Sequence, residues 1–166
     1  MSNEHEFSER SEAEAFAVCE RLLETTRDAL LTRDYPAFVS AFQLPVTMEA
    51  FEGRRVVDTD DCFRRTFDAA CNYYAAQHVT DLVRHVVAAA FVGPDDINST
   101  IECRVLAGTR LVQAPFAVHS RMKRVAGDDW RIIETIYLVE DAPRFSRILS
   151  IGPGAAHKHM DQPRTI

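Results

Sequence analysis

Residues 80–91 read TDLVRHVVAAAF and mark the point where the hydrophobic period of the sequence changes from helical to two. Apolar side chains alternate with polar ones here, as in a half-buried β-strand. Arg84 and His85 are neighbours in this strand, and neighbouring side chains point to opposite faces of a sheet. Either one of them points toward the interior, where it would be a candidate functional residue, or both faces of the sheet are partly polar.

The alternating pattern continues to about residue 140. We predict four strands, over residues 81–92, 99–108, 111–125 and 129–140. Short stretches rich in Gly, Asp and Pro separate them and are typical of turns. The stretch GDD at residues 127–129 indicates a hairpin between the last two strands.

Upstream of residue 80 the apolar side chains recur every three or four residues, which predicts helices. Ser11 and Glu14 fit a capping box, in which each side chain bonds the other residue's backbone amide. We therefore expect the first helix to run from Ser11 to about Arg33. Residues 1–11 are expected to be a polar lead-in.

The next segment predicts a short helix, a hairpin and a longer helix. Asp34 can cap the short helix, which we expect to end before Pro45. Glu52 and Gly53 suit a tight turn between two strands. Acidic residues in DTDDCF (residues 58–63) favour the positive end of a helix dipole. This order predicts an α+β fold, with helices packed on one face of a curved mixed sheet.

Three segments resemble corresponding parts of the nuclear transport factor 2-like superfamily (SnoaL-like proteins). They are RDYPAFVSAF (residues 33–42), DTDDCFRRTF (58–67) and GDDWRIIETIYLVED (127–141). The resemblance covers roughly residues 11–141. It implies a cone-shaped sheet wrapped around N-terminal helices, also called a cystatin-like roll, with a pocket that opens at one end.

We expect one domain, because 166 residues suffice for a single well-buried core. The resemblance places the cone domain over residues 1–141. Residues 142–166 are expected to be a C-terminal tail, with a short helix near residues 145–149.

The resemblance does not fix the function. The superfamily includes ketosteroid isomerases, scytalone dehydratase, polyketide cyclases and limonene epoxide hydrolase, and also non-catalytic modules. One fold therefore serves both catalysis and assembly. Many members form homodimers that pack sheet against sheet, which implies a homodimer through the outer sheet face here.

The charge and hydropathy of the sequence argue against nucleic acids and membranes as partners. The net charge of −6 lacks the basic character that nucleic-acid binding requires. The longest apolar run, residues 86–92, is far too short to cross a membrane. The acidic start of the sequence does not resemble a secretory or transit peptide, so we expect a cytoplasmic protein.

The cysteines give no indication of a metal or redox site. Cys19, Cys62, Cys71 and Cys103 form no CxxC pair. We expect free thiols, no metal and no cofactor, since a reducing compartment disfavours disulfides.

Strict alternation assigns the strand faces. On this assignment His85 and Glu134 are polar exceptions on the apolar inner face, and Arg84 points outward. A bulge between Asp81 and His85 would exchange Arg84 and His85. A buried histidine and glutamate can act as an acid–base pair, with His85 transferring the proton and Glu134 orienting it. The alternative is that both are hydrogen-bonded core residues.

Ketosteroid isomerases use an aspartate as the base, and alternation places no Asp on the inner face of these strands. The other residues expected to line the pocket come from the apolar faces of the helices and strands. They are Phe38, Phe42, Phe67, Tyr74, Cys103, Ser120 and Met122.

These observations predict a protein that binds a small apolar ligand. If it turns that ligand over, the chemistry would be that of a cofactor-free isomerase, dehydratase or cyclase acting on a carbonyl compound. The alternative is a dimerisation or scaffold module that resembles the small subunits of ring-hydroxylating dioxygenases. An enzyme would bring polar groups together in a cavity. A scaffold would fill that cavity with Phe38, Phe42, Phe63 and Phe67.

Overall fold

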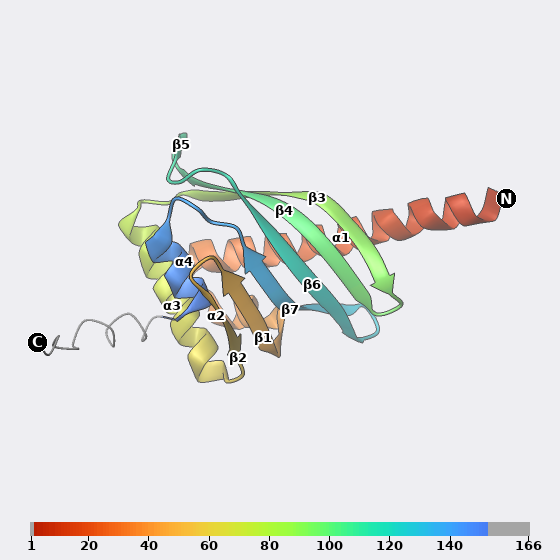
Figure 1. Cartoon of the computed structure of the whole chain (residues 1–166), viewed down its shortest axis with the longest axis horizontal. Helices are drawn as coiled ribbons and strands as arrows, with labels where there is room; N and C mark the ends of the chain where they lie inside the picture. Colours follow the sequence, from red (N-terminus) through yellow and green to blue (C-terminus); the bar gives the residue numbers. More distant parts are fainter. Residues whose placement is uncertain (1, 153–166) are drawn as a thin grey trace, which may run out of the picture.

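A long helix lies along one face of a twisted sheet in the computed structural model, which describes residues 2–152 and the side chains from residue 11 onward (Figure 1). No helix in this part of the chain is long and apolar enough to span a membrane. In chain order the elements are α1 (Ser2–Thr32), α2 (Tyr35–Ser40), β1 (Phe42–Ala50), β2 (Gly53–Val57), α3 (Asp60–Ala76), β3 (Asp81–Gly93), β4 (Asp96–Ala107), β5 (Arg110–Leu111), β6 (Phe116–Ala126), β7 (Asp129–Tyr137) and α4 (Pro143–Ser150).

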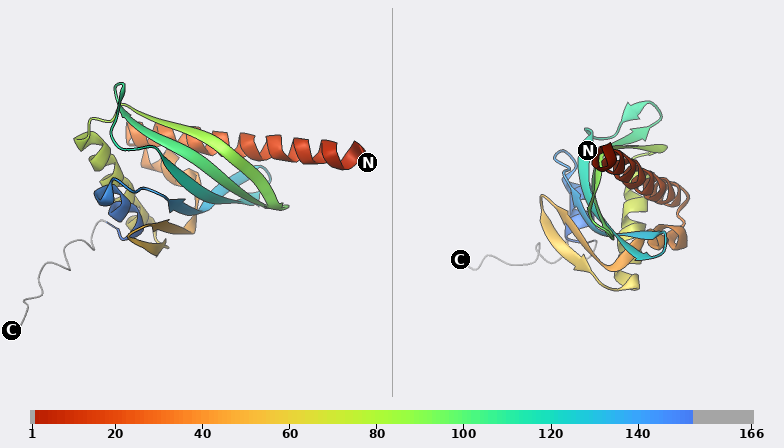
Figure 2. Two further views of the ribbon diagram at one scale, coloured as in Figure 1. Left: turned by 45° about the horizontal axis from the view of Figure 1, so that its top comes forward. Right: turned by 90° about the vertical axis from the view of Figure 1, so that its right-hand side faces the viewer.

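The strands form one mixed sheet in the order β2-β1-β7-β6-β4-β3, and β5 pairs with β4. β1 and β7 run parallel, whereas all other pairs are antiparallel. Figure 2 shows the strands curving around one side of α1, while α3 and α4 lie together near one end of the sheet. The predicted α+β cone is confirmed.

Several element boundaries differ from the predictions, and two of them change the interpretation. α1 begins at Ser2 and passes through Ser11 and Glu14, so the capping box proposed there is wrong. The predicted strand over residues 111–125 is divided into the short β5 and a longer β6 that begins at Phe116. The break coincides with Pro115, which has no N–H to donate to a strand ladder.

Local sequence signals explain the other starts and turns. The Asp34 carboxylate accepts a hydrogen bond from the Ala37 amide at 3.1 Å and caps α2, as predicted. The Thr59 hydroxyl accepts one from the Cys62 amide at 3.2 Å and caps α3. Gly127 adopts a φ of +47° in the β6–β7 hairpin, a conformation that glycine reaches without strain.

The core under α2 and α3 is aromatic. Phe63 is only 1% exposed and contacts Phe38 and Phe42, with ring centroids 5.5 and 4.9 Å away. Phe67 packs on Phe38 in a tilted arrangement, with ring centroids 4.8 Å apart. Phe42 begins β1 instead of continuing the second helix, yet it still packs on Phe38 at 4.9 Å. These contacts join the helices to the sheet.

The packed domain extends beyond residue 141, because α4 packs on β1 and α3. Phe145 and Leu149 of α4 are buried. Arg55 fixes the end of α4, since its Nε donates to the Leu149 carbonyl at 3.0 Å. The short helix expected near residues 145–149 is therefore part of the core. Most of the predicted tail, residues 153–166, lies outside the described residues.

β3 contains one residue more than its partner strand requires. Val86 pairs with Ile101 of β4, but Ala88 pairs with Thr100, so Val87 has no partner on β4. An extra residue of this kind is a β-bulge, and it exchanges the faces of all residues on one side of it.

β7 contains a second bulge. Arg121 of β6 pairs with Glu134, whereas Met122 pairs with Ile132, which leaves Ile133 without a partner on β6. The two bulges therefore lie in the strands that carry His85 and Glu134.

We predict that Phe63→Ala lowers the free energy of unfolding by about 3–5 kcal/mol, because it removes a fully buried ring and leaves a cavity. The matched control is Phe51→Ala, since Phe51 is 60% exposed and its loss should change stability by less than about 0.5 kcal/mol. Urea unfolding measures both. Equal losses for the two variants would contradict the described core.

Candidate functional site

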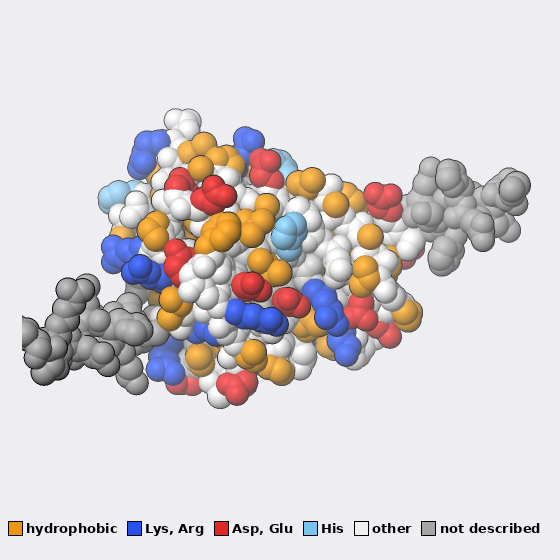
Figure 3. Space-filling model, viewed as in Figure 1, with side chains coloured by type: hydrophobic (Ala, Val, Ile, Leu, Met, Phe, Trp, Pro, Cys, Tyr) orange, Lys and Arg blue, Asp and Glu red, His pale blue; other side chains and the backbone are white. Residues whose placement is uncertain are grey.

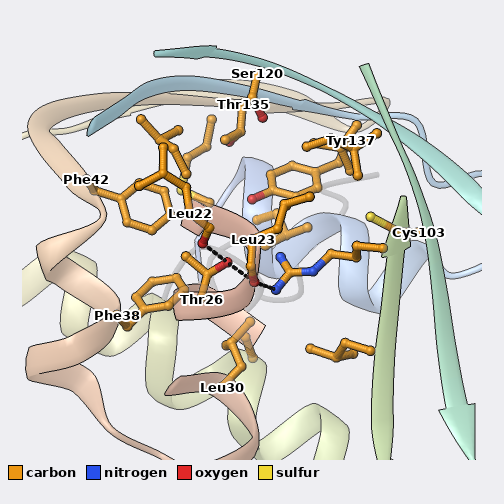
Figure 4. Close-up of a pocket in the computed structure, with 18 of the residues that line it drawn as sticks. Leu22, Leu23, Thr26, Leu30, Phe38, Phe42, Cys103, Ser120, Thr135 and Tyr137 are labelled. Atoms are coloured by element: carbon orange, nitrogen blue, oxygen red, sulfur yellow. Dashed lines mark hydrogen bonds between the residues drawn. The ribbon is translucent and has the colours of Figure 1, made fainter. Parts of the chain in front are cut away.

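A cavity of about 100 Å³ lies between α1, α3 and the inner face of the sheet (Figure 4). A single water needs only about 10–15 Å³ on this scale, so the space suits a small organic molecule. The cavity is lined by all seven residues that the sequence placed in the pocket, namely Phe38, Phe42, Phe67, Tyr74, Cys103, Ser120 and Met122.

The prediction for Arg84 and His85 is wrong. Arg84 lines the cavity, whereas the His85 side chain is exposed on the outer face, where His85 pairs in register with Glu102. The cause is the bulge at Val87. Ala89 and Phe91, beyond the bulge, face inward as alternation predicted, but the residues before it are reversed.

The predicted inner position of Glu134 is also wrong, because β7 too contains a bulge. Glu134 lies opposite Arg121 on the outer face and lines an open surface hollow with His119 and Ile136. His85 and Glu134 thus both lie outside the cavity, on strands separated by β4 and β6. They do not form an acid–base pair within it.

Thr135 and Tyr137 take the inner positions on β7 that the prediction gave to Glu134 and its neighbours. The bulge at Ile133 puts them there. Figure 4 shows the Tyr137 hydroxyl pointing into the cavity from the sheet, opposite Leu22 and Leu23 of α1. The sequence analysis missed Arg84, Thr135 and Tyr137. The sequence gives only a weak indication that β7 changes face. Tyr137 and Val139 are large and mainly apolar, yet strict alternation places them on the face that carries the charged residues.

The cavity has an apolar part and a polar part. The apolar part is formed by the aromatic cluster of α2, β1 and α3 together with leucines of α1. The polar part contains Arg84, Tyr74, Tyr137, Thr135 and Cys103. We expected converging polar groups for an enzyme and a cavity filled by aromatic rings for a scaffold. The structure has both, since aromatic rings fill one side of the cavity and polar groups meet at the other.

Arg84 is held against α1. One terminal nitrogen of its guanidinium donates to the Leu23 carbonyl at 2.9 Å. The same carbonyl accepts from the Thr26 hydroxyl at 3.2 Å (Figure 4). The Nε of Arg84 is buried and has no hydrogen-bond partner among the described residues, and the same is true of the Thr135 hydroxyl.

Burial controls protonation in the polar part. It raises the pKa of Tyr74 well above the usual value, and the nearby Arg84 only partly opposes this. Burial also raises the pKa of Tyr137. Desolvation disfavours the phenolate, so both hydroxyls stay protonated and can donate a hydrogen bond. Burial raises the pKa of the Cys103 thiol to about 11, which keeps it in the unreactive thiol form.

The polar groups of the lining are mainly hydrogen-bond donors. Among the described residues that line the cavity there is no Asp, Glu, His or Lys. No group of three or more His, Cys, Asp or Glu side chains in the described part of the chain could hold a metal ion. The cavity offers hydrogen-bond donors and apolar surface, which suit a ligand with an acceptor group at one end.

Solved structures of other proteins share the fold of this chain. No protein-family model and no curated protein matches the sequence. A cystatin-like domain of unknown function from Nostoc punctiforme is 14% identical with a TM-score of 0.59, over 76% of this chain and 78% of that one. An NTF-2-like protein of unknown function from Shewanella oneidensis is 9% identical with a TM-score of 0.54, over 74% and 97%.

A third structure is described as a putative calcium/calmodulin-dependent protein kinase type II association domain from Thiobacillus denitrificans. It is 11% identical with a TM-score of 0.57, over 74% of this chain and 94% of that one. At these identities the matches show the fold alone. The chain has the nuclear transport factor 2-like fold that its sequence resembles.

We predict that iodoacetamide at pH 8 alkylates Cys62 in the folded protein before Cys19, Cys71 or Cys103. Burial raises the pKa of those three thiols to about 11, so only about one in a thousand is a thiolate at pH 8. Cys62 is only partly buried. Peptide mass spectrometry measures the order, and the same reaction in denaturant is the control. Equal modification of Cys103 and Cys62 in the folded state would contradict the described burial.

Proposed function

We propose that this nuclear transport factor 2-like cone binds a small, largely apolar molecule in the cavity between α1, α3 and the sheet. The observation that supports this most directly is a cavity of about 100 Å³ whose lining is mainly aliphatic and aromatic, with a few polar groups on one side. Protein interiors are normally close-packed. Apolar cavities with a small number of convergent polar groups are typical of ligand sites.

Binding, without turnover, is the function that we propose. The acid–base chemistry expected of an isomerase, dehydratase or cyclase needs a group that titrates near neutral pH at the reacting atom. The lining residues within the described chain supply tyrosines and a cysteine whose pKa values burial raises. These groups can orient a ligand by donating hydrogen bonds.

We also propose that the protein forms a homodimer through the outer face of the sheet. Val87 is 61% exposed on this face, and the adjacent Ala88 and Ala90 are exposed as well. Figure 3 views this face and shows apolar side chains interspersed with charged ones. Ion pairs such as Arg104–Glu102, at 2.9 Å, neutralise part of the charge. Such a mixed surface suits contact with a second copy.

We predict that Val118→Phe blocks binding of a neutral apolar probe such as toluene. Val118 is buried on β6 and lines the cavity, so a larger ring would occupy part of the ligand space. Overpacking should cost about 1–3 kcal/mol of stability. The matched control is Val56→Phe, because Val56 is 60% exposed on β2 and does not line the cavity. Titration monitored by NMR amide shifts measures binding. Wild-type protein that does not bind toluene, or Val118→Phe that binds it as well as wild type, would contradict the proposal.

We predict a mass of twice 18.7 kDa for the wild-type protein in light scattering at micromolar concentration. Val87→Lys should shift the protein to monomer, because it would place two like charges in the interface. Val56→Lys introduces the same charge at a similarly exposed site on β2 and should remain dimeric. A monomeric wild type would overturn the proposed dimer.

A further inference from the structure

Arg84 on β3 and Arg104 on β4 lie near the cavity, Arg84 on the inner face of the sheet and Arg104 on the outer face, and they differ in their partners. Arg104 forms an ion pair with Glu102 at 2.9 Å, and half of its side chain is exposed. Arg84 makes no ion pair with any carboxylate in the described part of the chain, and its one hydrogen bond is to the neutral Leu23 carbonyl. Arg84 is therefore a positive charge in a mainly apolar lining with no negative partner among the described residues.

Placing Arg84 there without a negative partner does not help the protein to fold. The Arg84 side chain is only partly buried, but a buried N–H without an acceptor still costs free energy, so such donors are usually paired. The guanidinium carries five N–H donors in a fixed planar arrangement, and its buried Nε–H has no acceptor among the described residues. Residues that break a folding rule without local compensation are often functional.

The groups around Arg84 are also donors. Tyr74, Tyr137 and Cys103 lie close enough to Arg84 for its charge to act on each of them. No hydrogen bond from the Tyr74 or Tyr137 hydroxyl to a protein acceptor is found among the described residues, and both hydroxyls are held in the protonated form. The Thr135 hydroxyl lies close enough to Tyr137 to lower its pKa in part, but makes no hydrogen bond of good geometry within the described residues. The polar part of the cavity therefore presents one positive charge and several O–H and N–H donors.

We propose that the ligand of this cavity carries a single carboxylate, which Arg84 binds with hydrogen bonds from the Tyr74 and Tyr137 hydroxyls. An ionised carboxylate only accepts hydrogen bonds and matches the planar arginine group. The apolar body of the ligand lies against the aromatic part of the cavity. This inference rests on the proposed function and adds the chemical class of the ligand, a small aliphatic or aromatic monocarboxylate.

A single unpaired arginine, Arg84, in the cavity lining favours a ligand with one negative charge. A phosphate ester carries close to two negative charges at neutral pH, and recognition of it usually needs more than one basic group. Arg104 on the outer face is already paired with Glu102. Arg55, whose charge also acts on Tyr137, does not line the cavity, and the Leu149 and Ile148 carbonyls accept its hydrogen bonds.

The test compares three aromatic probes of similar shape that differ in charge, namely benzoate, neutral nitrobenzene and cationic benzylammonium. We expect wild-type protein to bind benzoate at least about tenfold more tightly than nitrobenzene, because charge-assisted hydrogen bonds are worth about 1.5–3 kcal/mol. Benzylammonium should not bind detectably. Isothermal titration calorimetry or NMR titration at low salt measures the dissociation constants.

Arg84→Met tests the assignment of the cation. It should remove the preference for benzoate while nitrobenzene still binds, since the cavity is retained and becomes more apolar. The matched control is Arg121→Met on the outer face of β6, which should keep the preference, because Arg121 does not line the cavity. If Arg84→Met does not fold, Arg84→Gln keeps a polar side chain without the charge and should show the same loss.

The outcomes separate this inference from the proposed function. Equal binding of benzoate and nitrobenzene by the wild type would overturn the carboxylate assignment and leave small-molecule binding intact. A benzoate preference that survives loss of the Arg84 charge would also overturn it. Binding of none of the three probes, nor of toluene, would overturn both proposals.

Discussion

The site depends on one constraint, the strict alternation of side chains along a β-strand, and on the two places where that alternation is interrupted. One extra residue in a strand reverses the faces of every residue on one side of it. Val87 in β3 and Ile133 in β7 are such residues. They place Arg84 and Tyr137 inside and His85 and Glu134 outside. A one-residue irregularity in each of two strands thus determines the chemistry of the cavity.

The rest of the fold keeps this cavity from collapsing. The sheet can bury its inner face only against helices, and α1 lies along that face next to β3. The aromatic cluster around Phe63 fixes α2 and α3 at one end. Arg55 fixes the end of α4 through the Leu149 carbonyl. Rigid contacts on several sides allow a hollow to persist in an interior that would otherwise pack closely.

Pattern in the sequence was sufficient for the fold, and for the apolar part of the site, because both depend on features that repeat. The change of period near residue 80 predicts the sheet, and spacing of three and four predicts α3. A single irregularity such as a bulge does not repeat, so the sequence pattern could not predict it. The sequence gives no sign of a bulge when the residues at it are alike, as in VVAAA after His85 and in the two isoleucines before Glu134. The candidates that failed lie next to these two runs, whereas Cys103, Ser120 and Met122, on strands without an internal bulge near them, were placed correctly.

Arg84 also shows how stability and binding oppose each other in this fold. Desolvation of a guanidinium is costly, which favours His85 over Arg84 as the inner residue when the sequence is considered alone. The structure instead leaves the Arg84 side chain only partly buried, and its terminal nitrogen donates to the Leu23 carbonyl at 2.9 Å. A hydrogen bond to a neutral carbonyl recovers less than pairing with a carboxylate would. The buried Nε–H of Arg84 still lacks an acceptor among the described residues, so a ligand that supplies one beside the positive charge would be favoured there.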